Sequence, residues 1–182
     1  MTKYGGKDLL IQRATTLTAW VTLTAYKVGD YVSQSGTNYV CLIAHTAGTF
    51  ATDLAALKWA VQASQPYQTV AGMRSTSMSI NNEQVDVTEK GSVPWRQLLA
   101  VGIRSMELSA SGIFSDAYSM DEMQNDSMNG TIATFKIISG RGDSFLGSFL
   151  VGTMERNGEY NGAEQYSLSL ASSGTIAYTA AP

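Results

Sequence analysis

The sequence contains little of what catalysis, metal binding and disulfide bonding require. Its 182 residues include one cysteine, Cys41, and one histidine, His45. A single cysteine excludes an intrachain disulfide and leaves the redox compartment undetermined. His and Cys nowhere form a cluster with metal-ligand spacing, and no third group in the sequence visibly orients the Cys–His pair. We therefore predict no metal, no cofactor and no catalytic residue.

Charge and long apolar runs are also scarce. Only 15% of the residues are charged, against roughly a quarter in a typical soluble domain. The net charge of −3 disfavours a dedicated nucleic-acid binder, which is normally basic. No stretch approaches the roughly 20 apolar residues of a membrane helix, and no apolar run follows the N-terminal lysines. We expect a chain without a membrane anchor, made and folded in a cytoplasm, with surface left for burial against partners.

Proline is rare, at 3 residues, whereas serine and threonine fill stretches in which polar and apolar residues alternate. Such a period of two predicts strands with one face in a core and the other in water. We expect strands at 7–12, 67–70, 73–80, 105–114, 131–138, 145–155 and 165–171, and a short last strand at 175–179. The solvent face of the two central strands would carry Ser75, Ser77, Ser79, Ser105, Glu107, Ser109 and Ser111.

One helix stands out between two of these strands. Ser115 or Asp116 can cap its start, Asp121 and Glu122 suit the positive helix N-terminus, and Asn129-Gly130 ends it. A further helical turn is predicted at 95–99. The fold class is therefore mostly β, a β-sandwich with one flanking α-helix.

The long segment between the two central strands is apolar. It carries Val85, Val87, Val93, Trp95, Leu98 and Leu99. Because an apolar loop of this length is seldom left in water, we predict that it covers a neighbouring subunit.

A second kind of sequence interrupts this pattern. Residues 17–65 are rich in aromatics, and their charged residues, Lys27, Asp30, Asp53 and Lys58, cancel. We predict a small all-β module of residues 17–65 inserted into a discontinuous domain of residues 1–16 and 66–182.

The discontinuous domain resembles the tail tube proteins of long-tailed phages and of gene transfer agents. The matching stretches, in order, are Gly6-Lys7-Asp8-Leu9-Leu10, Val70-Ala71-Gly72-Met73-Arg74-Ser75, Glu83-Gln84-Val85-Asp86-Val87-Thr88, Trp95-Arg96-Gln97-Leu98-Leu99, Ser109-Ala110-Ser111-Gly112-Ile113-Phe114 and 167–174. The resemblance implies a structural virion protein, assembled in the bacterial cytoplasm, whose hexameric rings stack into the tail tube. It also implies a lumen that conducts DNA and a tape-measure protein, and contacts with tail completion and tip proteins. The serine-rich strand face would then line the lumen.

The inserted segment resembles the small carbohydrate-binding modules of families 5 and 12. The resemblance lies in Ala19-Trp20, in 26–32 with its Gly29-Asp30 turn, in Tyr39-Val40-Cys41, in Ala44-His45-Thr46 and in Trp59. It implies aromatic rings that stack on sugars, with Trp20, Tyr26 and Trp59 as candidates, and host-surface glycans as partners. We expect the module to lie outside the tube, because it is too large for a lumen that holds DNA.

Two alternatives remain. The chain could be a carbohydrate-binding adhesin carried on a β-sandwich, which would be monomeric. An enzymatic role such as glycan hydrolysis would need a pair of carboxylates across a cleft, and the sequence designates no such pair.

Overall fold

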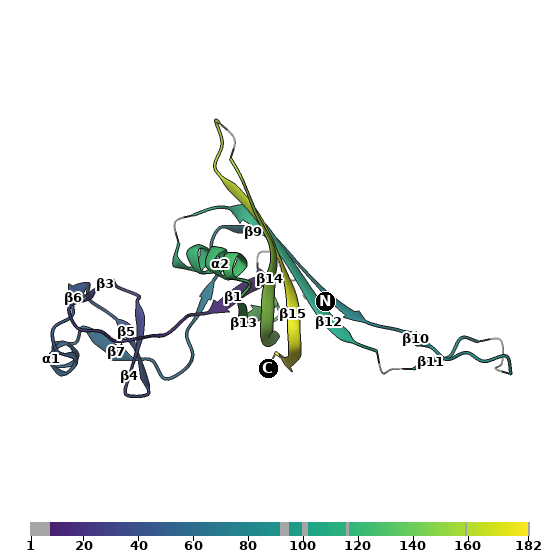
Figure 1. Cartoon of the computed structure of the whole chain (residues 1–182), viewed down its shortest axis with the longest axis horizontal. Coiled ribbons are helices and arrows are strands. Elements are labelled where there is room, and N and C mark those ends of the chain that lie inside the picture. The colour runs from purple at the N-terminus through teal and green to yellow at the C-terminus, as the bar shows by residue number, and fades with distance from the viewer. Residues whose placement is uncertain (1–7, 92–94, 100–101, 116, 159, 182) are drawn as a thin grey trace. The chain divides into compact units, whose positions relative to one another are not determined.

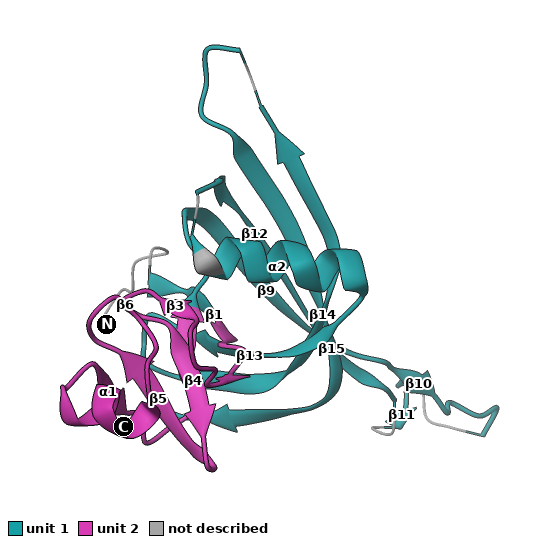
Figure 2. Ribbon diagram, turned by 60° about the vertical axis from the view of Figure 1, so that its left-hand side comes forward, with its two compact units in different colours: residues 1–12, 69–182 teal, residues 13–68 magenta. Residues whose placement is uncertain are grey.

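The computed structural model describes residues 8–91, 95–99, 102–115, 117–158 and 160–181. The chain forms two compact units, one of residues 1–12 with 69–182 and one of residues 13–68 (Figure 2). The second unit contains the segment 17–65 that the sequence predicts as an inserted module.

Seven strands join into one sheet in the order β8-β1-β13-β14-β15-β12-β9 (Figure 1). Their bounds are β1 Leu10–Ala14, β8 Tyr67–Thr69, β9 Met73–Asn82, β12 Arg104–Ile113, β13 Ile132–Ile138, β14 Ser144–Asn157 and β15 Gln165–Thr179. The pairings that connect β13, β14, β15, β12 and β9 are all antiparallel. The predicted mostly-β fold class is thereby confirmed.

A single core serves the whole sheet. Ile11 of β1, Phe149 of β14 and Leu108 of β12 are buried in the same hydrophobic cluster, although no two of these strands are neighbours in the sheet. Interruptions in the register of β14, between Leu146 and Ser148 and between Val151 and Thr153, allow such bending. The sandwich is therefore made by one sheet that coils over its own core.

Helix α2, Tyr118–Asn129, is the predicted flanking helix and adds Met120 and Met123 to this core. Its N-cap is Ala117, which makes no side-chain capping bond, so the predicted cap by Ser115 is wrong; Asp116 lies outside the described residues. The predicted end is confirmed, because Gly130 follows the last turn with φ of 62°, a left-handed conformation that glycine adopts without steric cost.

Beyond the ends of β9 and β12 the chain continues as a narrow ribbon (Figure 1). Its strands are β10, Val85–Asp86, and β11, Leu98–Leu99, which pair with each other. We call residues 83–103 the arm. The helical turn predicted at 95–99 is wrong, because Leu98 and Leu99 pair with β10 and the carbonyl of Gln97 accepts a hydrogen bond from the Val87 N–H.

The second unit has its own strands and core. It contains a four-stranded sheet in the order β2-β4-β5-β7, a two-stranded sheet β3-β6 and a helix α1. The bounds are β2 Thr18–Ala19, β3 Ala25–Tyr26, β4 Tyr31–Gln34, β5 Thr37–Cys41, β6 His45–Thr46, α1 Phe50–Ala55 and β7 Trp59–Val61. The expectation of an all-β module is therefore wrong by one short helix.

Candidate functional site

The seven residues predicted to share a solvent face do lie on one face of the sheet. Residues directly opposite each other in an antiparallel pair point to the same side, and Ser79 pairs with Glu107, Ser77 with Ser109 and Ser75 with Ser111. The apolar residues between them, such as Leu108, point into the core. Ser105, which pairs with Asn81, continues the face toward the arm.

The same face continues onto two strands that the prediction left out. Ser109 pairs with Ser169 of β15, and Ser169 pairs with Thr153 of β14. Ser167 and Glu155 extend the next row. We call the eleven residues the serine face: Ser75, Ser77, Ser79, Ser105, Glu107, Ser109, Ser111, Thr153, Glu155, Ser167 and Ser169.

Hydrogen bonds hold the hydroxyls of the serine face in place across strands. The Oγ atoms of Ser77 and Ser109 lie 2.7 Å apart, and Thr153 Oγ1 lies 2.7 Å from Ser169 Oγ. Ser167 donates to Glu155 over 3.4 Å. The charged members of the face are Glu107 and Glu155, so the surface is hydroxylic with a weak negative charge.

The serine face is carried by a block of four strands, β14-β15-β12-β9, and this block has two free edges. β9 is the last strand of the sheet. On the other side, the pairing of β13 with β14 ends at Leu150, so no described strand pairs with residues 151–157 along that edge. An unpaired strand edge presents N–H and C=O groups that another chain can take up.

The arm exposes apolar side chains that a solitary chain would leave in water. Trp95 is 79% exposed, and Val85, Val87, Leu98 and Leu99 are also exposed. No described residue from 84 to 99 belongs to the core of the first unit. Val93, the remaining member of the predicted contact loop, lies outside the described residues.

Polar contacts keep the arm in its ribbon form. Asp86 accepts hydrogen bonds from the backbone N–H of Thr88, over 2.9 Å, and from Arg96 Nε, over 2.9 Å. Hydrogen bonding by Thr88 and then by Arg96 lowers the pKa of Asp86. The described residues of the arm therefore form an apolar surface that lies outside the core of the first unit.

In the second unit, two of the three aromatic candidates for sugar stacking are buried. Tyr26 is 8% and Trp59 2% exposed, and their rings pack edge to face at 5.0 Å. A unit this small needs its aromatic residues for its own core. The prediction that these two rings stack on sugars is therefore wrong, whereas Trp20, half-buried against Phe50, keeps that role only as a prediction.

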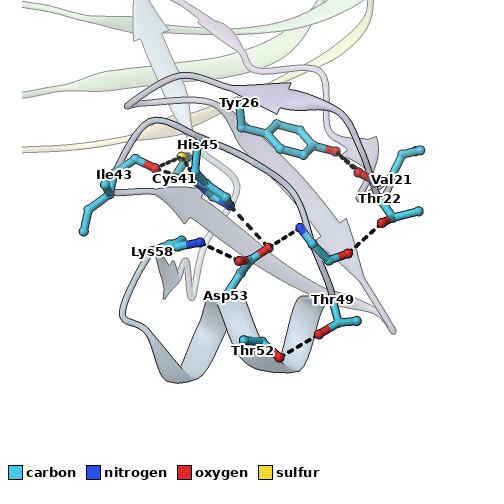
Figure 3. Close-up of polar contacts among 11 residues, drawn as sticks. Val21, Thr22, Tyr26, Cys41, Ile43, His45, Thr49, Thr52, Asp53 and Lys58 are labelled. Carbon is cyan, nitrogen blue, oxygen red and sulfur yellow. Dashed lines mark hydrogen bonds and ion pairs between the residues drawn. The ribbon is translucent and has the colours of Figure 1, made fainter.

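The Cys–His pair does have a third group beside it, contrary to the sequence-based expectation (Figure 3). His45 Nδ1 lies 3.9 Å from Cys41 Sγ, and His45 Nε2 lies 3.5 Å from Asp53 Oδ2. However, Nδ1 also lies 2.7 Å from the carbonyl oxygen of Ile43, so it must donate there and cannot accept the thiol proton. Burial raises the pKa of Cys41, which is 0% exposed, so the thiol stays protonated and out of reach.

Asp53 instead organises the second unit. Its Oδ1 accepts a hydrogen bond from Lys58 Nζ over 2.7 Å, and its Oδ2 accepts one from the Gly48 N–H over 2.9 Å. It thus joins the start of α1 to the loop before it and to the residue that precedes β7. These hydrogen bonds, that of Lys58 first, lower the pKa of Asp53 below its ordinary 3.8.

Asp53→Asn should lower the melting temperature of the second unit by several degrees at pH 7, because a buried amide cannot satisfy both donors as the carboxylate does. A carboxyl with a lowered pKa stabilises the fold above its unfolded-state pKa and loses that effect as pH falls. The gap between the variant and the wild type should therefore close below about pH 3.8. Fluorescence of Trp20 and Trp59 during heating measures it, and equal stabilities at neutral pH would contradict this role.

The described residues contain neither a metal site nor a membrane-spanning helix. Among the described residues, no group of three or more His, Cys, Asp and Glu side chains is arranged to hold a metal ion. No helix within the described ranges is long and apolar enough to cross a membrane.

Comparison with known proteins gives two family matches. Residues 57–178 match the family described as phage tail tube protein, and residues 19–53 match carbohydrate-binding module family 5/12. Comparison with curated protein sequences gives no match.

Solved structures similar to the chain include two from gene transfer agents. One is the tail of an empty particle refined with C6 symmetry, which is 35% identical, has a TM-score of 0.61, and is matched over 65% of this chain and 89% of that chain. The other, a native virion, gives 35% identity, a TM-score of 0.60 and coverage of 63% and 89%. The SPP1 tail tube, 14% identical with a TM-score of 0.51 over 64% and 69%, is similar in fold.

Proposed function

Since this chain belongs to the phage tail tube protein family, we propose that its copies close into sixfold rings and that these rings stack into the tube of a virion tail. The proposal rests on the four-stranded block β14-β15-β12-β9. One face of this block is the serine face, and its two outer strands, β14 and β9, each have a free edge. The C6 symmetry of the 35% identical gene transfer agent tail supports the number six.

Ring closure follows from the directions of these strands. Neighbours within the block run antiparallel, and because the block has an even number of strands, its two outer strands also run in opposite directions. When β9 of one copy lies beside residues 151–157 of the next, the new pair is again antiparallel. Six blocks can thus close into a barrel that has no exposed edge.

The serine face would line the bore of this barrel. Duplex DNA carries one negative charge per about 1.7 Å, so lysines or arginines along the wall would hold it by releasing counterions. Hydroxyls with an occasional carboxylate offer no such anchors. The same wall suits an elongated tape-measure protein before DNA passes. Tail completion and tip proteins would contact the two ends of the tube.

The arm would contact a neighbouring copy. Its exposed side chains Val85, Val87, Trp95, Leu98 and Leu99 leave the block beyond β9 and β12, where a subunit of the same or the next ring can cover them. This supports a homo-oligomer and disfavours the alternative of a monomeric adhesin, as does the burial of Tyr26 and Trp59.

We place the inserted module outside the tube. The chain enters it from β1 and leaves it into β8, and both strands lie at the sheet edge farthest from β9. The two connections adjoin, since the Thr15 N–H donates to the Pro66 carbonyl over 2.9 Å and Gln65 Nε2 to the Thr15 carbonyl over 2.8 Å. These connections support a module that lies away from the bore.

Electron microscopy of the purified chain tests the proposal together with the module's place. The full chain should form sixfold rings or tubes, and a variant in which Asn-Gly replaces residues 16–65 should form tubes of the same bore and smaller outer diameter. A wild-type chain that stays monomeric at high concentration would refute the tube. A variant that yields only monomers, beside wild-type tubes, would make the module part of the subunit interface.

A further inference from the structure

A groove opens where the sheet divides into two ribbons. The pairing of β12 with β15 ends at Glu107 and Ala171, but the β9–β12 ribbon and the β14–β15 ribbon both continue beyond that point and diverge (Figure 1). Between them lies a groove of about 630 Å³. Ile80, Arg104 and Met106 line one wall, and Phe145, Ile176 and Tyr178 line the other.

The groove is open to solvent, and its lining combines apolar and aromatic side chains with polar ones. Ile80 is 54% and Tyr178 57% exposed, and the Tyr178 ring lies 5.1 Å from that of Phe145. Arg104 is exposed at the groove and makes no ion pair with any described residue. The surface therefore suits an aromatic side chain that arrives with negative charge around it.

A segment with these properties lies at the opposite end of the same strands. The hairpin between β14 and β15 extends beyond the pair Asn157–Gln165 (Figure 2), and Tyr160 in it is fully exposed. Within the hairpin, Glu164 forms an ion pair with Arg156 over 2.6 Å, and the sequence from 156 to 164 has a net charge of −1. The hairpin thus presents an exposed aromatic ring on a segment of weak negative charge.

We infer that the groove of one copy receives the β14–β15 hairpin, centred on Tyr160, of a copy in the adjacent ring. The inference rests on the proposed tube, in which rings stack in one orientation. The hairpin and the groove lie at opposite ends of β15, from Gln165 to Tyr178, on the order of 40 Å apart at about 3.3 Å per residue. Two different surfaces of one chain that fit each other head to tail continue a stack indefinitely.

The charges agree with this docking. Arg104 would face a hairpin whose net charge over residues 156–164 is −1, so the two surfaces differ in sign. The arm is a poorer occupant, because it leaves the block at the same end as the groove. The arm of an adjacent, equally oriented ring therefore starts a full strand length away.

A double variant, Tyr160→Cys with Thr175→Cys, tests the contact in assembled tubes. Thr175 lines the groove, and the native Cys41 is 0% exposed and should not react. A short bismaleimide should produce a ladder on denaturing gels that extends well beyond six subunits, since each copy links to the rings above and below. A ladder that stops at six would place the contact within one ring, and no cross-links in intact, thiol-labelled tubes would also overturn the inference. Each single variant is the control.

The energetic test compares Tyr160→Ala with Tyr160→Phe. Truncation of a central aromatic anchor should raise the critical concentration for tube formation by about tenfold or more, whereas phenylalanine keeps the ring and most of the affinity. An alanine variant that assembles like the wild type would refute the docking. The variants are compared with a wild-type chain that forms tubes. A wild-type chain that forms no tubes would refute the proposed function, independently of the docking.

Discussion

Removal of the arm should abolish tubes while leaving both units folded. In this variant Asn-Gly replaces residues 84–102, which is sterically feasible because the Glu83 N–H already donates to the Ile103 carbonyl over 2.9 Å. The variant lacks five exposed apolar side chains, Val85, Val87, Trp95, Leu98 and Leu99. At about 1.5–3 kcal/mol for each side chain that is buried in the assembly, the critical concentration should rise at least a thousandfold, roughly.

Sedimentation and electron microscopy measure this loss, and circular dichroism with the fluorescence of Trp20 and Trp59 verifies the fold. A matched variant, Trp95→Ser with Leu98→Ser, keeps the ribbon and should shift assembly in the same direction by less. The variant without residues 16–65 is the control for a large deletion that spares the tube. Normal tubes from the chain without its arm would show that the exposed side chains are not an assembly surface.

The strands of the first unit were largely predictable, because alternation reports a strand with one buried face. Residues 105–114 were predicted and β12 is Arg104–Ile113. β15 was predicted as two strands, since Ser172-Ser173-Gly174 looks like a break. The structure passes through it with Gly174 at φ of 83°, and the pairing with β14 resumes at Ala177. A local break in pattern does not reveal whether a neighbouring strand continues.

The serine face was only partly predictable for a related reason. Alternation assigned seven residues to one face, but Thr153, Glu155, Ser167 and Ser169 belong to it through strand order. Ser167-Leu168-Ser169-Leu170 alternates as clearly as β12 does. What the sequence does not contain is the information that β15 lies beside β12.

In the inserted module the residue types indicated the carbohydrate-binding family. They did not predict which of the aromatic side chains are buried. Tyr26 and Trp59 occur where a sugar-stacking ring would be sought, yet both complete a small core. Helix α1 spans only Phe50–Ala55, which is too short for helical periodicity to appear. His45 of β6 and Asp53 of α1 lie eight positions apart, and only the fold of the chain between them brings the two side chains together.

A single reversal of charge on the serine face should slow the passage of DNA without preventing assembly. Glu107 is exposed between Ser79 and Ala171, and no described side chain forms an ion pair with it, so Glu107→Lys leaves the packing of β12 unchanged. In a sixfold tube the substitution places six lysines in every ring. Each can hold a phosphate and release its counterion, so the affinity of the wall for DNA accumulates along the bore.

We expect short duplex DNA to sediment with Glu107→Lys tubes at low salt and to be released as salt rises, whereas wild-type tubes leave it in solution. In virions, DNA ejection should slow and infective titre should fall by about tenfold or more. Glu107→Gln removes the carboxylate without adding a cation and should behave nearly as the wild type. Asn125→Lys puts the same charge on α2, which covers the core side of the sheet, and controls for net charge.

If the Glu107 and Asn125 variants bound DNA equally, or if ejection stayed normal, the serine face would not be the wall of the bore. If the Glu107→Lys chain failed to assemble, the carboxylate would lie at a contact between subunits, because only there would a lysine oppose closure of the ring.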